Sequence, residues 1–138
     1  MTDTNNTSLR NAGVMLLSAA SSVLLAALWH RFGWARPYST DGYEFTQYLT
    51  SCVSWWFILV YLSSGWGLGW ITRTAWPVAL GMISPLPIAF CVEVAKDPTS
   101  HNLIPFEVVL FWVPALALAF AGAYTGLRLR AGAQGPVA

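Results

Sequence analysis

Four long runs of uncharged, mostly apolar residues alternate with short polar segments along the chain. The runs cover residues 11–30, 45–72, 74–92 and 108–127. Each run comes close to or exceeds the length of about 20 predominantly apolar residues that an α-helix needs to cross a membrane. The pattern therefore predicts an all-α protein, an integral membrane bundle of four transmembrane helices. We expect the helices over residues of about 12–31, 45–71, 76–95 and 105–127, in one domain of residues 12–130, with a polar N-terminal tail over 1–11 and a flexible C-terminal tail over 131–138.

Prolines interrupt the third predicted helix near its middle. Pro85 and Pro87 each lack a backbone N–H, and each ring clashes with the preceding helical turn. A kink of more than about 20° is therefore expected near Met82–Pro85. In lipid, the carbonyl groups that lose their donors need other partners. The hydroxyl of Ser84, next to the break, is one candidate.

Small residues recur at helical spacing in three of the predicted helices. The first contains the Ala/Ser stretch 18–22, the second the GxxxG pair Gly65 and Gly69, and the fourth Gly122 and Gly126. Small side chains let helix backbones approach closely in lipid. These faces predict helix–helix contacts. They exceed what four helices need among themselves, which favours association with further helices.

Composition excludes several classes of protein. Charged residues make up 9% of the 138 residues, against roughly 25% in a typical soluble domain. A soluble globular domain, a disordered chain and a disulfide scaffold are therefore excluded. The formal net charge is +1 and no basic stripe is present, so nucleic acid is not an expected partner. We expect the lipid bilayer as the surroundings, a homo-oligomer or a larger membrane complex as the assembly, and no cofactor.

Two cysteines, Cys52 and Cys91, lie inside apolar runs and form no CxxC motif. Thioredoxin-type and zinc-finger sites are therefore excluded. Buried cysteines usually behave as small hydrophobic residues, and this is the favoured interpretation for both. A disulfide or a metal-binding role is the alternative.

The distribution of basic residues predicts the orientation of the helices. The face formed by the termini and the second loop holds Arg10, Arg73, Arg128 and Arg130. The opposite face, formed by the first and third loops, holds Arg31, Arg36 and Lys96. Cytoplasmic segments carry an excess of Lys and Arg. The distribution therefore predicts that both termini are cytoplasmic.

Acidic and histidine residues gather on the face opposite the termini. The candidates for a binding site or a proton or ligand pathway are Glu93, Asp97, His101, Glu107 and His30. Carboxylate and imidazole groups suit a proton relay or a first-row metal ion, and the metal candidates are Glu93, Asp97, His101 and Glu107. The alternative is structural, since an acid in the first turn of a helix, such as Glu107, complements the helix dipole. Asp97-Pro98 is equally an ordinary turn signal.

One segment carries a resemblance. Residues 97–107, with the sequence DPTSHNLIPFE, are similar to a stretch of small, uncharacterised bacterial four-span integral membrane proteins. The resemblance implies the bacterial cytoplasmic membrane as the location and brings no known activity. The sequence contains no nucleophile-elbow, Walker-type or HExxH motif either.

These observations favour a non-enzymatic membrane protein that acts by association, as an accessory subunit or a homo-oligomer. The first alternative is a small transporter or channel that uses the membrane-edge carboxylates, because broken helices are typical of transporters. The second alternative is a membrane metal-binding protein or enzyme centred on Glu93, Asp97, His101 and Glu107.

Overall fold

The computed structural model describes residues 2–32, 55–96 and 108–133, and these residues are helical apart from short connections. The elements are α1 (Thr2–Arg31), α3 (Trp55–Thr72), α4 (Trp76–Ile83), α5 (Pro85–Lys96), the π-helical turn η1 (Val108–Trp112) and α7 (Val113–Ala133). The described residues contain no strand, so the all-α prediction is confirmed. Two helical stretches, Asn6–Trp29 and Val109–Ala133, are long and apolar enough to cross a membrane, and Trp76–Val92 is a shorter apolar stretch.

The outer helices extend further than the apolar pattern predicts. The first begins at Thr2 and so includes the residues predicted as a polar tail, and the last continues to Ala133. Apolar residues indicate which part of a helix can lie in lipid, whereas the helix itself ends where backbone hydrogen bonding stops. No proline interrupts residues 2–13, and helical hydrogen bonding continues through them. Residues 45–54 of the second predicted helix and 105–107 of the fourth lie outside the described residues.

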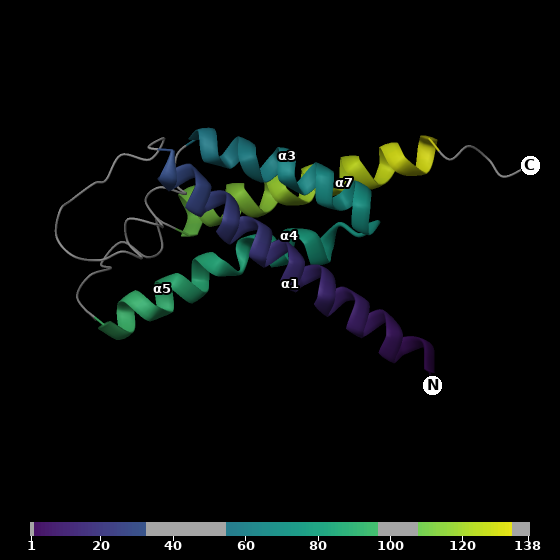
Figure 1. Cartoon of the computed structure of the whole chain (residues 1–138), viewed down its shortest axis with the longest axis horizontal. Coiled ribbons are helices and arrows are strands. Elements are labelled where there is room, and N and C mark those ends of the chain that lie inside the picture. The colour runs from purple at the N-terminus through teal and green to yellow at the C-terminus, as the bar shows by residue number, and fades with distance from the viewer. Residues whose placement is uncertain (1, 33–54, 97–107, 134–138) are drawn as a thin grey trace, which may run out of the picture.

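The described helices form a bundle in which successive segments alternate in direction (Figure 1). Helices α3 and α7 lie side by side and run parallel, while α1 and the α4–α5 segment run the opposite way. Helix α4 packs against both α1 and α7. Both ends of the chain consequently lie toward the same end of the bundle (Figure 1). This arrangement is the one expected of four consecutive antiparallel segments.

Small and medium-sized residues fill the space where the helices cross. The core of the described helices includes Val78, Ala79 and Met82 of α4, and Ala119 and Ala123 of α7. Many large apolar side chains point outward; Leu16 on α1 and Leu110 in η1 are 72% and 55% exposed. The bundle therefore has a closely packed interior of small residues and an apolar exterior.

The third predicted helix is divided into α4 and α5 by a turn at Ser84. Pro85 has no N–H to donate to the carbonyl of Gly81. The Ser84 hydroxyl donates to that carbonyl instead, at 2.8 Å, and the Ser84 amide lies 3.3 Å from it. The helix is thus interrupted next to Pro85, as predicted. The hydroxyl of Ser84, the predicted candidate, replaces the hydrogen bond to the Gly81 carbonyl that Pro85 cannot donate. The predicted kink of more than about 20° stays a prediction.

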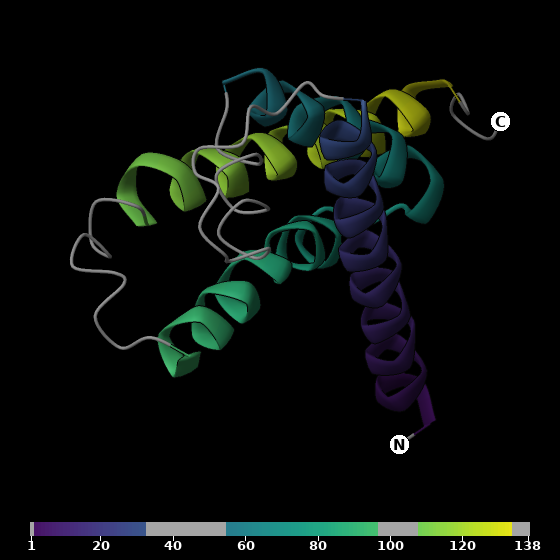
Figure 2. The same ribbon diagram turned by 60° about the vertical axis from the view of Figure 1, so that its left-hand side comes forward.

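Helix α5 leaves the rest of the bundle beyond this break (Figure 2). Among the described elements it contacts α4 and α1 at a few positions, and it buries Leu86 and Ala89. An edge-to-face contact between Phe90 and Trp112, with ring centroids 5.8 Å apart, links it to η1. Its apolar surface is partly uncovered, since Ile88 is 62% exposed.

Candidate functional site

The predicted acidic site lies largely outside the described part of the chain. Glu93 lies in the last turn of α5 and His30 at the end of α1, and the side chains of both are outside the described residues. Asp97, His101 and Glu107 belong to residues 97–107, which the structure does not describe. The C-terminal ends of α1 and α5 lie apart in both views (Figures 1 and 2). Convergence of the five residues into one site stays a prediction.

The described residues offer no alternative metal centre. Within residues 2–32, 55–96 and 108–133, no group of three or more His, Cys, Asp or Glu residues could hold a metal ion. Cys91 is a free thiol and is exposed on α5, so it is not buried within the single chain; its role as a small hydrophobic residue stays a prediction. Cys52 lies outside the described residues.

The closest helix contact joins α3 to α7 through glycines on both helices. A Cβ atom added to Gly65 would lie 2.5 Å from the carbonyl oxygen of Ala119, and one on Gly69 would collide with the backbone of Ala123. From the other helix, a Cβ atom on Gly122 would lie 2.9 Å from the backbone nitrogen of Trp66. These backbones touch directly, so the approach depends on the absence of side chains at the glycines.

A second close contact joins α1 to α4. Ser18 and Ser22 lie on the buried face of α1 and are its buried polar residues. A Cβ atom added to Gly81 of α4 would lie 2.8 Å from both the Met15 Cα and the Ser18 Cβ. The Ser18 hydroxyl donates to the Val14 carbonyl at 2.8 Å, so its polar group is satisfied within its own helix.

These two contacts change one expectation from the sequence. We expected the small-residue faces to exceed what the helices need internally. The glycine pairs of α3 and α7 and the serines Ser18 and Ser22 of α1 are used inside the bundle. They therefore no longer support association with further helices.

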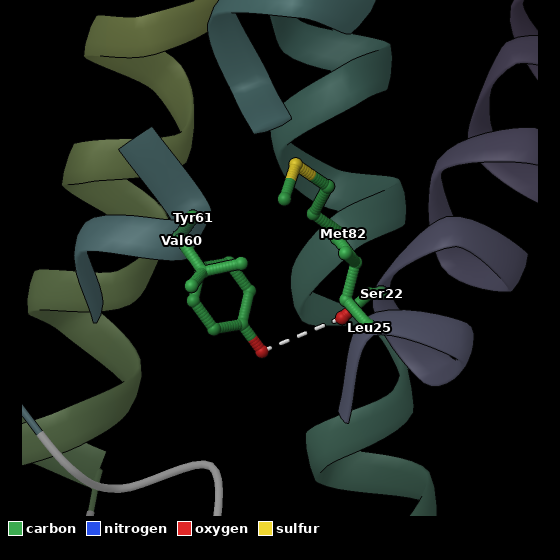
Figure 3. A pocket seen from close by; sticks show the side chains of 5 residues that line it. All are labelled: Ser22, Leu25, Val60, Tyr61 and Met82. Carbon is green, nitrogen blue, oxygen red and sulfur yellow. Dashed lines mark hydrogen bonds between the residues drawn. The ribbon is translucent and has the colours of Figure 1, made fainter. Parts of the chain in front are cut away.

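A small hollow lies where α1, α3 and α4 meet (Figure 3). Ser22, Leu25, Val60, Tyr61 and Met82 line it, and the space between them is too narrow to admit a water molecule. Tyr61 directs its hydroxyl toward Ser22, whose Oγ lies 3.5 Å away, at the long limit for a hydrogen bond (Figure 3). The hollow is a packing feature and leaves no room for a ligand.

Arginines form the remaining polar feature, at the C-terminal ends of α3 and α7. The Nη1 atom of Arg130 donates to the carbonyl oxygens of Trp70 at 2.6 Å and Ile71 at 3.4 Å. A cation at these carbonyls complements the negative end of the α3 dipole. Arg73 follows α3 with a φ of 60°, and its amide donates to the Gly69 carbonyl at 3.0 Å, which closes the helix.

Arg128 also lies near the C-terminal end of α7 but has different partners from Arg130. Its Nε donates to the hydroxyl of Tyr124 at 2.9 Å, and its guanidinium carbon lies 5.0 Å from the centre of the tyrosine ring. In the sequence, these arginines indicated only the orientation of the helices. The four-residue spacing of Tyr124 and Arg128, which puts both on one helix face, is the signal that could have revealed the pair.

No known protein family, no curated protein and no solved structure matches the chain. The resemblance of residues 97–107 to bacterial four-span proteins consequently stays a prediction. The composition of the chain and the geometry of its helices are therefore the basis for a proposed function.

Proposed function

We propose that the chain is an integral protein of the bacterial cytoplasmic membrane, with four membrane-spanning segments and both termini in the cytoplasm. Its outer surface is the principal support. In the apolar windows of Asn6–Trp29 and Val109–Ala133, only 22% and 28% of the residues are buried. The core helix of a soluble protein is mostly buried. Soluble monomers rarely expose apolar patches of more than a few hundred Å². A lipid environment accounts for this exterior.

Within that membrane, we propose that the protein acts without catalysis, by association with another protein chain through α5. The observation that carries this proposal is the position of α5. The helix diverges from the other described helices (Figure 2); one of its faces is buried at Leu86 and Ala89, while the opposite face leaves Ile88 exposed. A helix from a second copy or from another membrane protein would cover this surface. It would thereby add packing contacts that lipid chains supply less well.

The described geometry favours association over transport. A transporter would use the break between α4 and α5 to expose carbonyl groups to a substrate. Here the Gly81 carbonyl accepts a hydrogen bond from Ser84, and the hollow beside Met82 is too narrow for water. The buried polar residues of the described helices are two serines, neither of which titrates.

Membrane integration and orientation are tested together. Membranes containing the chain are washed with alkaline carbonate, and reporter domains are fused to each terminus. We expect the chain to remain in the pellet and both reporters to give the cytoplasmic signal. A cysteine at Thr40 should react with an impermeant reagent from the outside. Release by carbonate would refute the membrane proposal, and labelling of that cysteine only from the inside would refute the orientation.

Association is tested by cross-linking at Cys91, which is exposed on α5. Cys52 is first replaced by Ser, and membranes are then treated with a short bismaleimide. We expect a product larger than one chain, at twice its mass for a second copy and at another mass for a different partner. The matched control moves the only cysteine to Ala20, on the exposed face of α1. Equal cross-linking at both positions, or none at Cys91 despite complete labelling, would contradict the proposal.

A further inference from the structure

The guanidinium of Arg128 is held in a fixed orientation on the outside of α7. One of its five N–H groups, that of Nε, bonds to the Tyr124 hydroxyl, and the tyrosine ring lies beside the group. The bond to Tyr124 uses the Nε–H, so the N–H groups of Nη1 and Nη2 are left for other acceptors. Two adjacent N–H donors of arginine match two oxygens of a phosphate group. Arg128, oriented by its bond to Tyr124, therefore presents N–H donors that suit an anion.

The position of Arg128 along α7 corresponds to the boundary of a bilayer. Twenty uncharged residues separate it from Glu107. At 1.5 Å per residue they span about 30 Å, the thickness of the hydrocarbon core. Trp76, Phe120 and Tyr124 form a continuous aromatic row below it, with centroid distances of 4.5 Å and 6.0 Å. Tryptophan and tyrosine are typical of the headgroup level.

The surroundings of Arg128 distinguish it from Arg130. The guanidinium of Arg130 faces the carbonyl oxygens that end α3, which already offset part of its charge. Arg128 instead bonds to a neutral hydroxyl and is exposed. Its neighbour Leu129 is 57% exposed, so this side of α7 combines an apolar surface with a positive charge that pairs with no carboxylate among the residues the structure describes. A phospholipid with a negatively charged headgroup matches both features.

We propose that Arg128, oriented by Tyr124, binds the headgroup phosphate of an anionic phospholipid at the end of the bundle that carries the termini. The inference rests on the proposed membrane location. The lipid chains would lie along the apolar face of α7, below the aromatic row. Binding at this position would anchor the helix at a defined depth in the leaflet.

The test uses the full chain purified in mild detergent, with phosphatidylglycerol and phosphatidylcholine as the probes. Lipid retained by the protein is counted by native mass spectrometry. We expect phosphatidylglycerol to be preferred, and Arg128→Gln to lower its apparent affinity by about fivefold, as expected for about 1 kcal/mol from one basic residue near an anionic surface. Tyr124→Phe keeps the charge but removes the hydroxyl that orients it, so a twofold to threefold loss of the order of one weak hydrogen bond is expected.

The matched control is Arg31→Gln, which removes the same charge from an exposed position at the opposite end of the bundle (Figure 1). It should leave retention of phosphatidylglycerol unchanged. An equal loss in both arginine variants, or no loss in Arg128→Gln and Tyr124→Phe, would overturn the proposal. Displacement of the lipid by millimolar inorganic phosphate would show a site for free phosphate and would equally refute it. Carbonate extraction of the same variants separates this outcome from a failure of the membrane proposal.

Discussion

Replacing Gly65 with alanine should separate α3 from α7. The added Cβ atom would lie 2.5 Å from the Ala119 carbonyl oxygen and 3.2 Å from its Cα, whereas ordinary contact begins at 3.4 Å. Both obstructing atoms belong to the backbone, so no side-chain rotation can relieve the clash. The two helices must therefore move apart locally by about 1 Å, a gap that removes a quarter to a half of the van der Waals attraction across it.

The magnitude follows from two opposing effects. Overpacking of this kind costs about 1–3 kcal/mol, and the upper part of that range applies because the obstacle is another helix backbone. Alanine also recovers about 1 kcal/mol of helix propensity relative to glycine. We therefore expect Gly65→Ala to lower the free energy of unfolding by about 2 kcal/mol.

Gly67 provides the matched control, because a Cβ atom added there would meet nothing within 4 Å. Gly67→Ala makes the same chemical change two residues further along the same helix. It should raise the free energy of unfolding by up to about 1 kcal/mol. Both variants are measured by reversible unfolding in mixed micelles, followed by circular dichroism. A Gly65→Ala protein as stable as the Gly67→Ala protein would refute the proposed backbone contact between α3 and α7.

Three further substitutions test other contacts in the same unfolding assay. Ser84→Ala should lower stability by about 1 kcal/mol, because the Gly81 carbonyl loses its hydroxyl donor; an unchanged protein would show that the break needs no such donor. Arg130→Gln should also lower it by about 1 kcal/mol, through the weakened contact with the end of α3, and a neutral result would remove that role. Met82→Ala should lower it by 2–5 kcal/mol, a typical range for emptying a buried site, since Met82 is 1% exposed; a smaller loss would mean that the hollow beside it collapses.

The apolar pattern predicted the helical class and the approximate location of the described helices. It also predicted the disturbance at Pro85, because a missing N–H has a local and unavoidable effect. Helix ends were predicted less well. The helices extend to Thr2 and Ala133, beyond the apolar runs. Backbone hydrogen bonding continues through these polar residues, and hydropathy does not detect it.

Partners of the small residues could not be predicted from spacing alone. Gly65 and Gly69 indicated a close contact, but a GxxxG pair does not specify which helix approaches it. The Tyr124–Arg128 pair was missed because the arginines were used only to predict the orientation of the helices across the membrane. That prediction depends on the number of arginines on each side and ignores which side chains share a helix face. The acidic candidates, from Glu93 to Glu107, lie at helix ends and in a connection. Their relative positions depend on loop conformation, which periodicity does not determine.

The parallel contact between α3 and α7 has a consequence for the order of assembly. Helix α7 follows α3, α4 and α5 in the chain, so it leaves the ribosome after them. Until it does, Gly65 and Gly69 lack the backbone that they contact in the folded chain. Native packing of α3 is thus delayed until the last described helix is in place. A chain that ends before Val108 should therefore lack the close contact that Gly65 and Gly69 make in the folded protein.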